Sequence, residues 1–141
     1  MTAVAPFNIP IRVYIEDTDA GGIVYYVNYL KYMERCRTEF LRALGYDKPA
    51  ILDDGKLLVV HKAEVSYLRP ARLDDQLQVT AAIAKMARTN VVFEQKIYAG
   101  NELLCEGLIR IACVVSGVMR PAAMPDAMRE KIAATIVNAQ N

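Results

Sequence analysis

After residue 45 the apolar pattern of this chain changes from helical spacing to alternation, and this change limits the folds that the chain can adopt. A stripe at helical spacing predicts a helix over about residues 28–44 that ends at Gly45; its members are Tyr29, Met33, Cys36, Phe40 and Leu44. Four later segments have the alternating or continuously apolar pattern of strands: 59–67, 77–83, 91–99 and 103–115. One long helix beside strands in hairpin-like succession predicts an α+β fold with the helix on one face of an antiparallel sheet.

The remaining segments complete this order. Residues 9–15 are largely apolar and predict a first strand, with Pro10 near its start. Further apolar residues widen the buried arc of the long helix, namely Leu30, Tyr32, Leu41 and Ala43, and Asn28 is the expected N-cap. Residues 46–56 predict a loop, with Pro49, Asp53, Asp54 and Gly55. Gly100-Asn101 predicts a hairpin turn, and a short closing helix places Met128, Ile132 and Ile136 on one face.

Size and charge restrict the function classes. A length of 141 residues predicts one domain over 1–141, and a net charge of +1 offers no general attraction for nucleic acid. The three cysteines lack metal-ligand spacing, so we expect free thiols in a reducing cytoplasm. We expect neither an export signal nor a membrane-spanning helix, because no apolar run approaches ~18 residues.

The stretch Asp17-Thr18-Asp19-Ala20-Gly21-Gly22 joins the first strand to the long helix and is the candidate site. A helix N-terminus has unbonded N–H groups and stabilises negative charge. A carboxylate beside such amides could serve as a base or nucleophile next to an oxyanion site. The alternative, that Asp17 or Asp19 only caps the turn, is equally compatible with the residues alone.

Other chemistries lack their motifs. The chain has no G-x-S-x-G elbow and no glycine-rich phosphate loop. His61 is the only histidine, and a lone histidine on a strand is more often structural. The cysteines lie in apolar segments typical of core positions, and Glu34 is interpreted as a solvated or ion-paired helix residue. Cations and donors at strand ends that could hold phosphates are Arg88-Thr89-Asn90, Lys62, Arg69 and Arg72, although such residues are more often only solvated loop ends.

Several quoted stretches resemble the 4-hydroxybenzoyl-CoA thioesterase group of hotdog-fold enzymes, with the greatest similarity to the Tol/Pal-associated acyl-CoA thioesterases. They are Arg12 through Tyr25, Asn28-Tyr29, Glu34-Arg35, Arg37-Thr38-Glu39 and Tyr67 through Asp75. The resemblance implies a long helix wrapped by a five-stranded antiparallel sheet, dimers formed by joining two sheets, and often tetramers. It also implies that Asp19 acts as base or nucleophile and that amides at the helix start polarise the thioester carbonyl.

Tyr26 matches a position at that helix start. Many Tol/Pal-associated members have a histidine there, whereas the benzoyl-CoA branch has a tyrosine. An imidazole role therefore does not carry over, although the backbone N–H of Tyr26 remains available.

The sequence and this resemblance together predict an acyl-CoA thioesterase. Asp19 would be the general base or nucleophile, and amides near Gly22 and Tyr26 would hold the carbonyl oxygen. CoA is part of the substrate, and we expect no separate cofactor and no metal. Arg88, Thr89 and Asn90 are expected to bind the phosphate end of CoA from a neighbouring subunit, and the acyl pocket is expected between the helix start and residues 57–65.

Two alternatives stay open. One is a non-catalytic hotdog module that binds acyl-CoA, acyl carrier protein or envelope-lipid enzymes. The other, a hotdog dehydratase, is weaker because that chemistry generally pairs an acid with a histidine, and the chain has only His61.

Overall fold

The computed structural model describes residues 6–48, 51–52 and 55–140, and the predicted loop residues Pro49, Asp53 and Asp54 lie outside them. The elements in chain order are β1 (Phe7–Arg12), the 3₁₀ turn η1 (Ile15–Asp17), α1 (Val27–Ala43), β2 (Lys56–Tyr67), β3 (Gln76–Met86), β4 (Asn90–Ala99), β5 (Glu102–Val115) and α2 (Asp126–Gln140). This order of strand, long helix, four strands and closing helix is the one that the sequence predicts.

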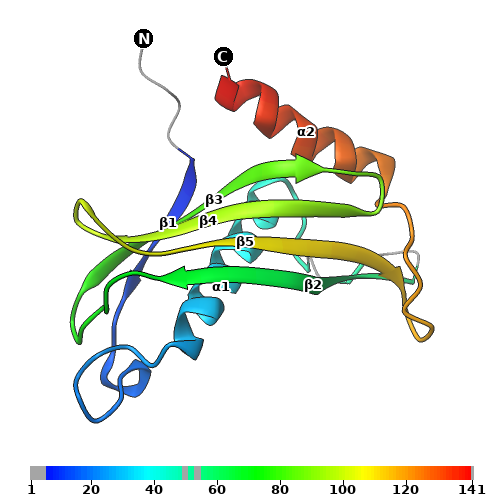
Figure 1. The fold of residues 1–141 in the computed structure, drawn as a ribbon. Helices are drawn as coiled ribbons and strands as arrows, with labels where there is room; N and C mark the ends of the chain where they lie inside the picture. The colour runs from blue at the N-terminus through cyan, green and yellow to red at the C-terminus, as the bar shows by residue number, and fades with distance from the viewer. Residues whose placement is uncertain (1–5, 49–50, 53–54, 141) are drawn as a thin grey trace.

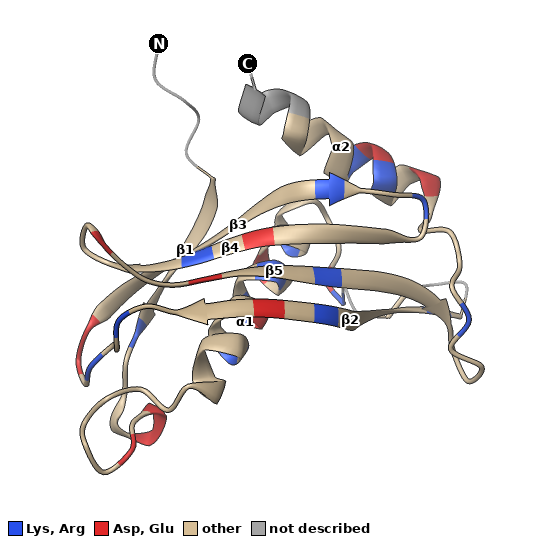
Figure 2. Ribbon diagram, in the orientation of Figure 1, with Lys and Arg blue, Asp and Glu red and all other residues tan. Residues whose placement is uncertain are grey.

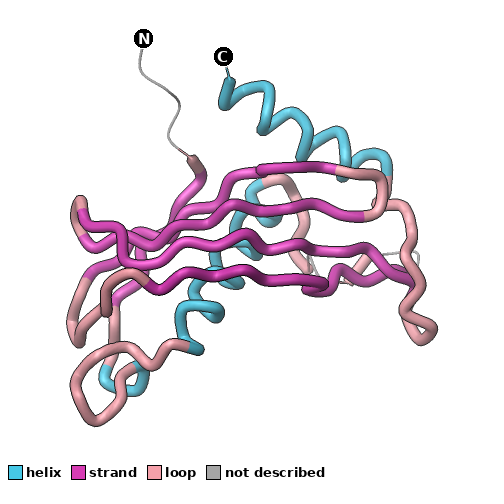
Figure 3. Tube along the Cα trace, viewed as in Figure 1, coloured by secondary structure: helices cyan, strands magenta, loops and turns pink. Residues whose placement is uncertain are grey.

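The five strands form one antiparallel sheet in the order β1-β3-β4-β5-β2 (Figure 1). Helix α1 crosses one face of this sheet, and α2 runs alongside the last part of β3 (Figures 1 and 3). A long helix wrapped by a five-stranded antiparallel sheet is the hotdog fold, so the predicted fold class is confirmed.

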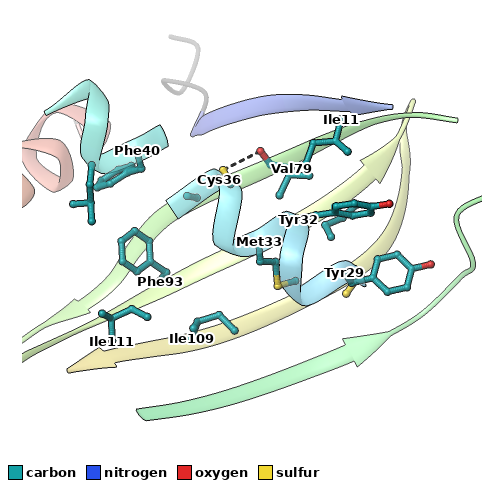
Figure 4. Close-up of a cluster of buried hydrophobic side chains, with 14 of the residues drawn as sticks. Ile11, Tyr29, Tyr32, Met33, Cys36, Phe40, Val79, Phe93, Ile109 and Ile111 are labelled. Atoms are coloured by element: carbon teal, nitrogen blue, oxygen red, sulfur yellow. Dashed lines mark hydrogen bonds between the residues drawn. The ribbon is translucent and has the colours of Figure 1, made fainter. Parts of the chain in front are cut away.

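The core lies between α1 and the sheet (Figure 4). From α1 it takes Tyr29, Tyr32, Met33, Cys36, Phe40 and Leu41, and from the sheet chiefly Val79, Phe93, Ile97, Ile109 and Ile111. Phe40 and Phe93 meet edge to face with ring centroids 5.3 Å apart. The buried arc is narrower than predicted, because Leu30 and Ala43 are exposed.

The first strand ends three residues earlier than predicted. β1 pairs only with β3, so Pro10 removes no donor that a second neighbour would need. Pairing continues as far as Val13, whose N–H donates to the Asp75 carbonyl. The chain then turns into η1, because the Asp17 carboxylate accepts the N–H of Tyr14 at 2.9 Å.

Strand β2 is the far edge of the sheet and pairs with β5, with an irregularity in register between Val60 and Lys62; Ile51 adds one isolated bridge to Leu57. The alternation of this segment predicts one protected face, yet no residue of the strand is fully buried. The physical reason is the position of α1, which lies chiefly over β1 and β3. The predicted protected face is therefore not buried within this chain.

The C-terminal part follows the prediction closely. Gly100 and Asn101 form the turn between β4 and β5. Helix α2 buries Met128 and Ile132 and half-buries Ile136, the three residues expected to share a face. No helix in the described part of the chain is long and apolar enough to cross a membrane.

Candidate active site

The segment between β1 and α1 folds as a small hairpin. The Tyr25 N–H donates to the Asp17 carbonyl, Thr18 and Val24 form an isolated antiparallel bridge, and the Asp19 N–H donates to the Ile23 carbonyl. Asp19 therefore stands at the tip of the hairpin, and the other strand of the hairpin leads directly into α1. Figure 2 shows acidic residues gathered on η1 and this turn.

The tip is a tight turn organised by Asp19. Its carboxylate Oδ1 accepts the N–H of Gly21 at 2.9 Å, and its carbonyl accepts the N–H of Gly22 at 3.1 Å. Gly22 has φ +77°, a backbone conformation that a side chain makes costly. The Asp19 side chain is exposed and keeps its second oxygen outside this turn. The Gly22 amide, expected to hold a carbonyl oxygen, is occupied within the turn.

The start of α1 has unbonded amides, as predicted, but a different cap. Tyr26 is the N-cap residue and its side chain makes no cap hydrogen bond. The N–H groups of Tyr26 and Val27 have no hydrogen-bond acceptor within the described residues. These two donors lie at the positive end of a 17-residue helix, where they can receive an oxyanion.

Asn28 was the predicted N-cap, and that prediction is wrong. Its side chain is buried and donates from Nδ2 to the Asp17 carbonyl at 2.8 Å, which ties η1 to the first turn of α1. Asp17 consequently accepts at its carbonyl from both Asn28 and Tyr25 and at its carboxylate from Tyr14. Asp17 therefore shapes the turn.

A group of tyrosines stands beside the helix start. Ring centroids lie 5.1 Å apart for Tyr25 and Tyr26, 5.9 Å for Tyr26 and Tyr67, and 5.6 Å for Tyr29 and Tyr67. Tyr26 is 57% exposed. The Tyr29 hydroxyl accepts the Ala71 N–H at 2.9 Å, which holds the β2–β3 connection against α1. Sequence reasoning missed this aromatic wall, because Tyr26 and Tyr67 are 41 positions apart.

Tyr32 is a second residue that the sequence did not single out for this site. Its hydroxyl is buried without a hydrogen-bond partner in the described structure. Burial, and secondarily the negative charge of Asp17, raises the pKa of the Tyr32 phenol. The phenol therefore stays neutral beneath the acidic turn.

Arg88, Thr89 and Asn90 lie at the other end of the sheet from Asp19. The Leu73 N–H bonds to the Gly22 carbonyl just before β3 begins, whereas Arg88 follows the end of that 11-residue strand. A strand of this length separates the two groups by about 35 Å. Within one chain the predicted phosphate-binding residues and the predicted catalytic turn do not share a site.

The other candidates have structural or surface positions. His61 is exposed at the irregular point of β2, and all three cysteines are buried. Glu34 is exposed on α1. Within residues 6–48, 51–52 and 55–140, no cluster of three or more His, Cys, Asp or Glu side chains could hold a metal ion.

A cavity of about 280 Å³ lies between α1 and the sheet near β2. It takes Leu58 and Val60 from the segment 57–65 that was expected to line an acyl pocket. Its helix residues, however, are Glu34, Arg37, Thr38 and Leu41, from the second half of α1 rather than the start.

Comparisons with known proteins agree with this architecture. A model of the thioesterase-like superfamily matches residues 13–132. The acyl-CoA thioester hydrolase YbgC of Escherichia coli O6:H1 is 44% identical over 120 residues, covering 84% of this chain and 90% of that protein. The acyl-CoA thioesterase YbgC of Haemophilus influenzae is 39% identical over 120 residues, covering 84% and 88%. A thioesterase of Thermus thermophilus, solved in complex with coenzyme A and Zn, is 29% identical with a TM-score of 0.76, covering 91% of this chain and 92% of that one.

Proposed function

Because the chain belongs to the thioesterase-like superfamily, we propose that it hydrolyses CoA thioesters to a free acid and CoA at the turn before α1. Its enzyme class is acyl-CoA thioesterase, since relatives of that name are 39% and 44% identical over most of the chain. The observation that carries the proposed site is an exposed carboxylate at Asp19 on the hairpin that leads into a helix start with two unbonded amides. No separate cofactor and no metal enters the proposed reaction.

The first step is attack on the thioester carbon. In one route Asp19 takes a proton from water as the water oxygen bonds to that carbon. In the other route the Asp19 carboxylate attacks directly, and water then hydrolyses the resulting anhydride. In the first route the tetrahedral intermediate expels the CoA sulfur, which takes the proton held by Asp19. In the second route the CoA thiolate leaves as the anhydride forms and takes a proton from water, and hydrolysis of the anhydride then frees Asp19 and the acid. The two routes share Asp19 as the group that starts the reaction.

The tetrahedral intermediate carries a negative oxygen that needs donors. The Tyr26 N–H, unbonded at the positive end of α1, is the proposed principal donor. Gly22 was also expected to donate, but its N–H is engaged by the Asp19 carbonyl at 3.1 Å. Gly22 is therefore proposed to let the turn close while leaving no side chain in the path of the incoming thioester.

A dimer completes the proposed site. Edge strand β2 has no fully buried residue, and an unpaired edge is a template for joining a second sheet. Two antiparallel β2 strands related by a two-fold axis would bring the partner's β3–β4 turn to the same end of the joined sheet as Asp19. This supports the assignment of Arg88, Thr89 and Asn90 to the phosphates of CoA bound at the neighbouring subunit's turn. Tetramers would form from two such dimers.

Substitution of the proposed base tests the function. Asp19→Asn retains an oxygen for the Gly21 N–H but removes the negative charge. We expect thiol release from short, long and aromatic acyl-CoAs to fall about 100-fold or more, with unchanged circular dichroism. The control is Glu16→Gln, which removes an exposed acid from η1 and should leave turnover unchanged. Near-normal turnover in Asp19→Asn would contradict the assignment.

A further inference from the structure

The cavity beside the second half of α1 is lined mostly by apolar side chains. They come from α1, three strands and the region of α2, and include Leu41, Leu58, Phe93, Ile111, Met124 and Ile132. Its volume of about 280 Å³ is nearly twice that of a ~150 Å³ apolar cavity that holds a benzene ring. The space therefore fits a compact apolar body of about six carbons together with a polar group.

One wall of this cavity carries a buried cation. Arg37 lines the cavity and is only 9% exposed. Its guanidinium donates from Nη1 to Gln95 Oε1 at 2.9 Å, and no other hydrogen bond of Arg37 occurs within the described residues. A guanidinium has five N–H donors, so most of its donor capacity is unused by the protein.

Gln95 holds this cation in place. The side chain is fully buried, and Nε2 donates to the Met33 carbonyl at 2.9 Å and to the Thr80 carbonyl at 3.3 Å. Because both carbonyls are backbone acceptors on α1 and β3, the amide oxygen is fixed toward Arg37. The guanidinium is therefore positioned before any ligand arrives.

The charge of Arg37 is not balanced by an ion pair within the described residues, because no carboxylate there lies within ion-pair distance of it. Burial lowers the pKa of the Arg37 guanidinium, and the negative charge of Glu34 opposes this shift. Glu34 also lines the cavity but is exposed to solvent. A buried, unpaired cation is costly, so an anion that enters the cavity gains a fixed, partly desolvated partner.

We propose that this cavity binds a small monocarboxylic acid, with its carboxylate on Arg37 and its apolar body against Phe93 and Leu58. Thr38, half-buried in the same lining, offers a hydroxyl to the same carboxylate. Arg37 lies 11 residues after Tyr26, about 16 Å further along α1. The acid site is thus distinct from the catalytic turn, and it does not depend on the function proposed for that turn.

Calorimetric titration of the intact protein with hexanoate and with hexanamide tests the site. The two probes share size and apolar body, but only hexanoate carries a charge. We expect hexanoate to bind at least tenfold more tightly than hexanamide. Arg37→Met, of similar length and without charge, should lose this preference. Arg42→Gln is the matched control, because Arg42 lies on the same helix but is exposed and paired with Glu39 at 2.6 Å.

A second variant keeps the test decisive where Arg37→Met fails to fold. Leu58→Trp fills the cavity from half-buried β2 while leaving Arg37 in place, and it should abolish hexanoate binding. Equal affinity for acid and amide, or unchanged hexanoate binding in the variant that folds, would overturn the proposal. A wild-type dimer that takes up no hexanoate would also overturn it, since a second copy would then cover the cavity.

Discussion

At the scale of single residues, the two glycines of the turn differ in a way that substitution can measure. Gly22 has φ +77°, and an added Cβ would meet nothing within 4 Å. A side chain there is disfavoured by backbone conformation and not by crowding, so Gly22→Ala should lower the free energy of unfolding by about 1–2 kcal/mol. Denaturant unfolding measures this loss, and thiol release should fall with it.

Gly21→Ala is the matched control for that variant. An added Cβ at Gly21 would lie 3.4 Å from Asp19 Oδ1, an acceptable contact, and φ is not in the left-handed region. We expect a change within about 0.5 kcal/mol. Equal losses in the two variants would show that the conformation of Gly22 does not hold the turn.

The cysteine thiols give a prediction with a defined pH dependence. Burial raises the pKa of both Cys36 and Cys105 to about 12. Unfolded thiols ionise near pH 8.5, so above that pH the unfolded chain loses protons that the folded chain retains. These two thiols should therefore lower the stability as pH rises from about 9 to 12, measured by denaturant unfolding at several pH values.

The same burial predicts thiol reactivity. With the native protein at pH 8, Cys36 and Cys105 should not react with a disulfide reagent until denaturant is added. The protein would then add no background to an assay of CoA release. Rapid reaction of either thiol in the native state would contradict the core positions assigned to them.

At the scale of elements, β2 is the strand whose predicted protected face is not buried within one chain. Val60 is 55% exposed at the irregular point of this edge strand, and no residue of the strand is fully buried although the alternation predicts one protected face. If β2 joins a second copy, Val60→Asp should place a charge in the interface and shift the protein toward monomers without unfolding it. Sedimentation equilibrium measures the shift.

Val118→Asp is the control, because Val118 is 65% exposed in the turn after β5, away from the edge. It should leave the association state unchanged. A Val60→Asp protein that associates as strongly as the wild type would rule out β2 as the joining edge.

At the scale of the whole molecule, the sequence predicts the architecture better than it predicts the site. Alternation and turn residues are local, so the strands, the Gly100-Asn101 hairpin and the buried face of α2 follow from them. Asn28 shows where local preference fails, because a buried hydrogen bond to the Asp17 carbonyl outweighs its tendency to cap. The separation of Arg88 from Asp19 depends on how the strands are ordered and paired in the sheet. The position of the cavity beside Glu34 and Arg37 depends on the same tertiary arrangement. Neither is encoded in a short stretch of sequence.

The separation of Arg88 from Asp19 within one chain allows a test of whether the site is shared between two subunits. If Asp19 of one subunit works with Arg88 of its neighbour, Asp19→Asn and Arg88→Glu should each be impaired alone, the second mainly through a higher KM. In a mixed dimer, one of the two sites then combines an intact Asp19 with an intact Arg88. Subunits mixed in equal amounts and allowed to exchange should recover about one quarter of wild-type activity at low substrate concentration.

The recovery separates two arrangements that the individual variants cannot. If both residues serve a site within one chain, every site in the mixture carries one defect, and mixing restores nothing. A mixture of Asp19→Asn with Glu16→Gln controls for exchange itself, because Glu16→Gln subunits should be active before and after mixing. Recovery only in the Asp19→Asn and Arg88→Glu mixture would place the phosphate-binding residues across the subunit boundary, about 35 Å from Asp19 of their own chain.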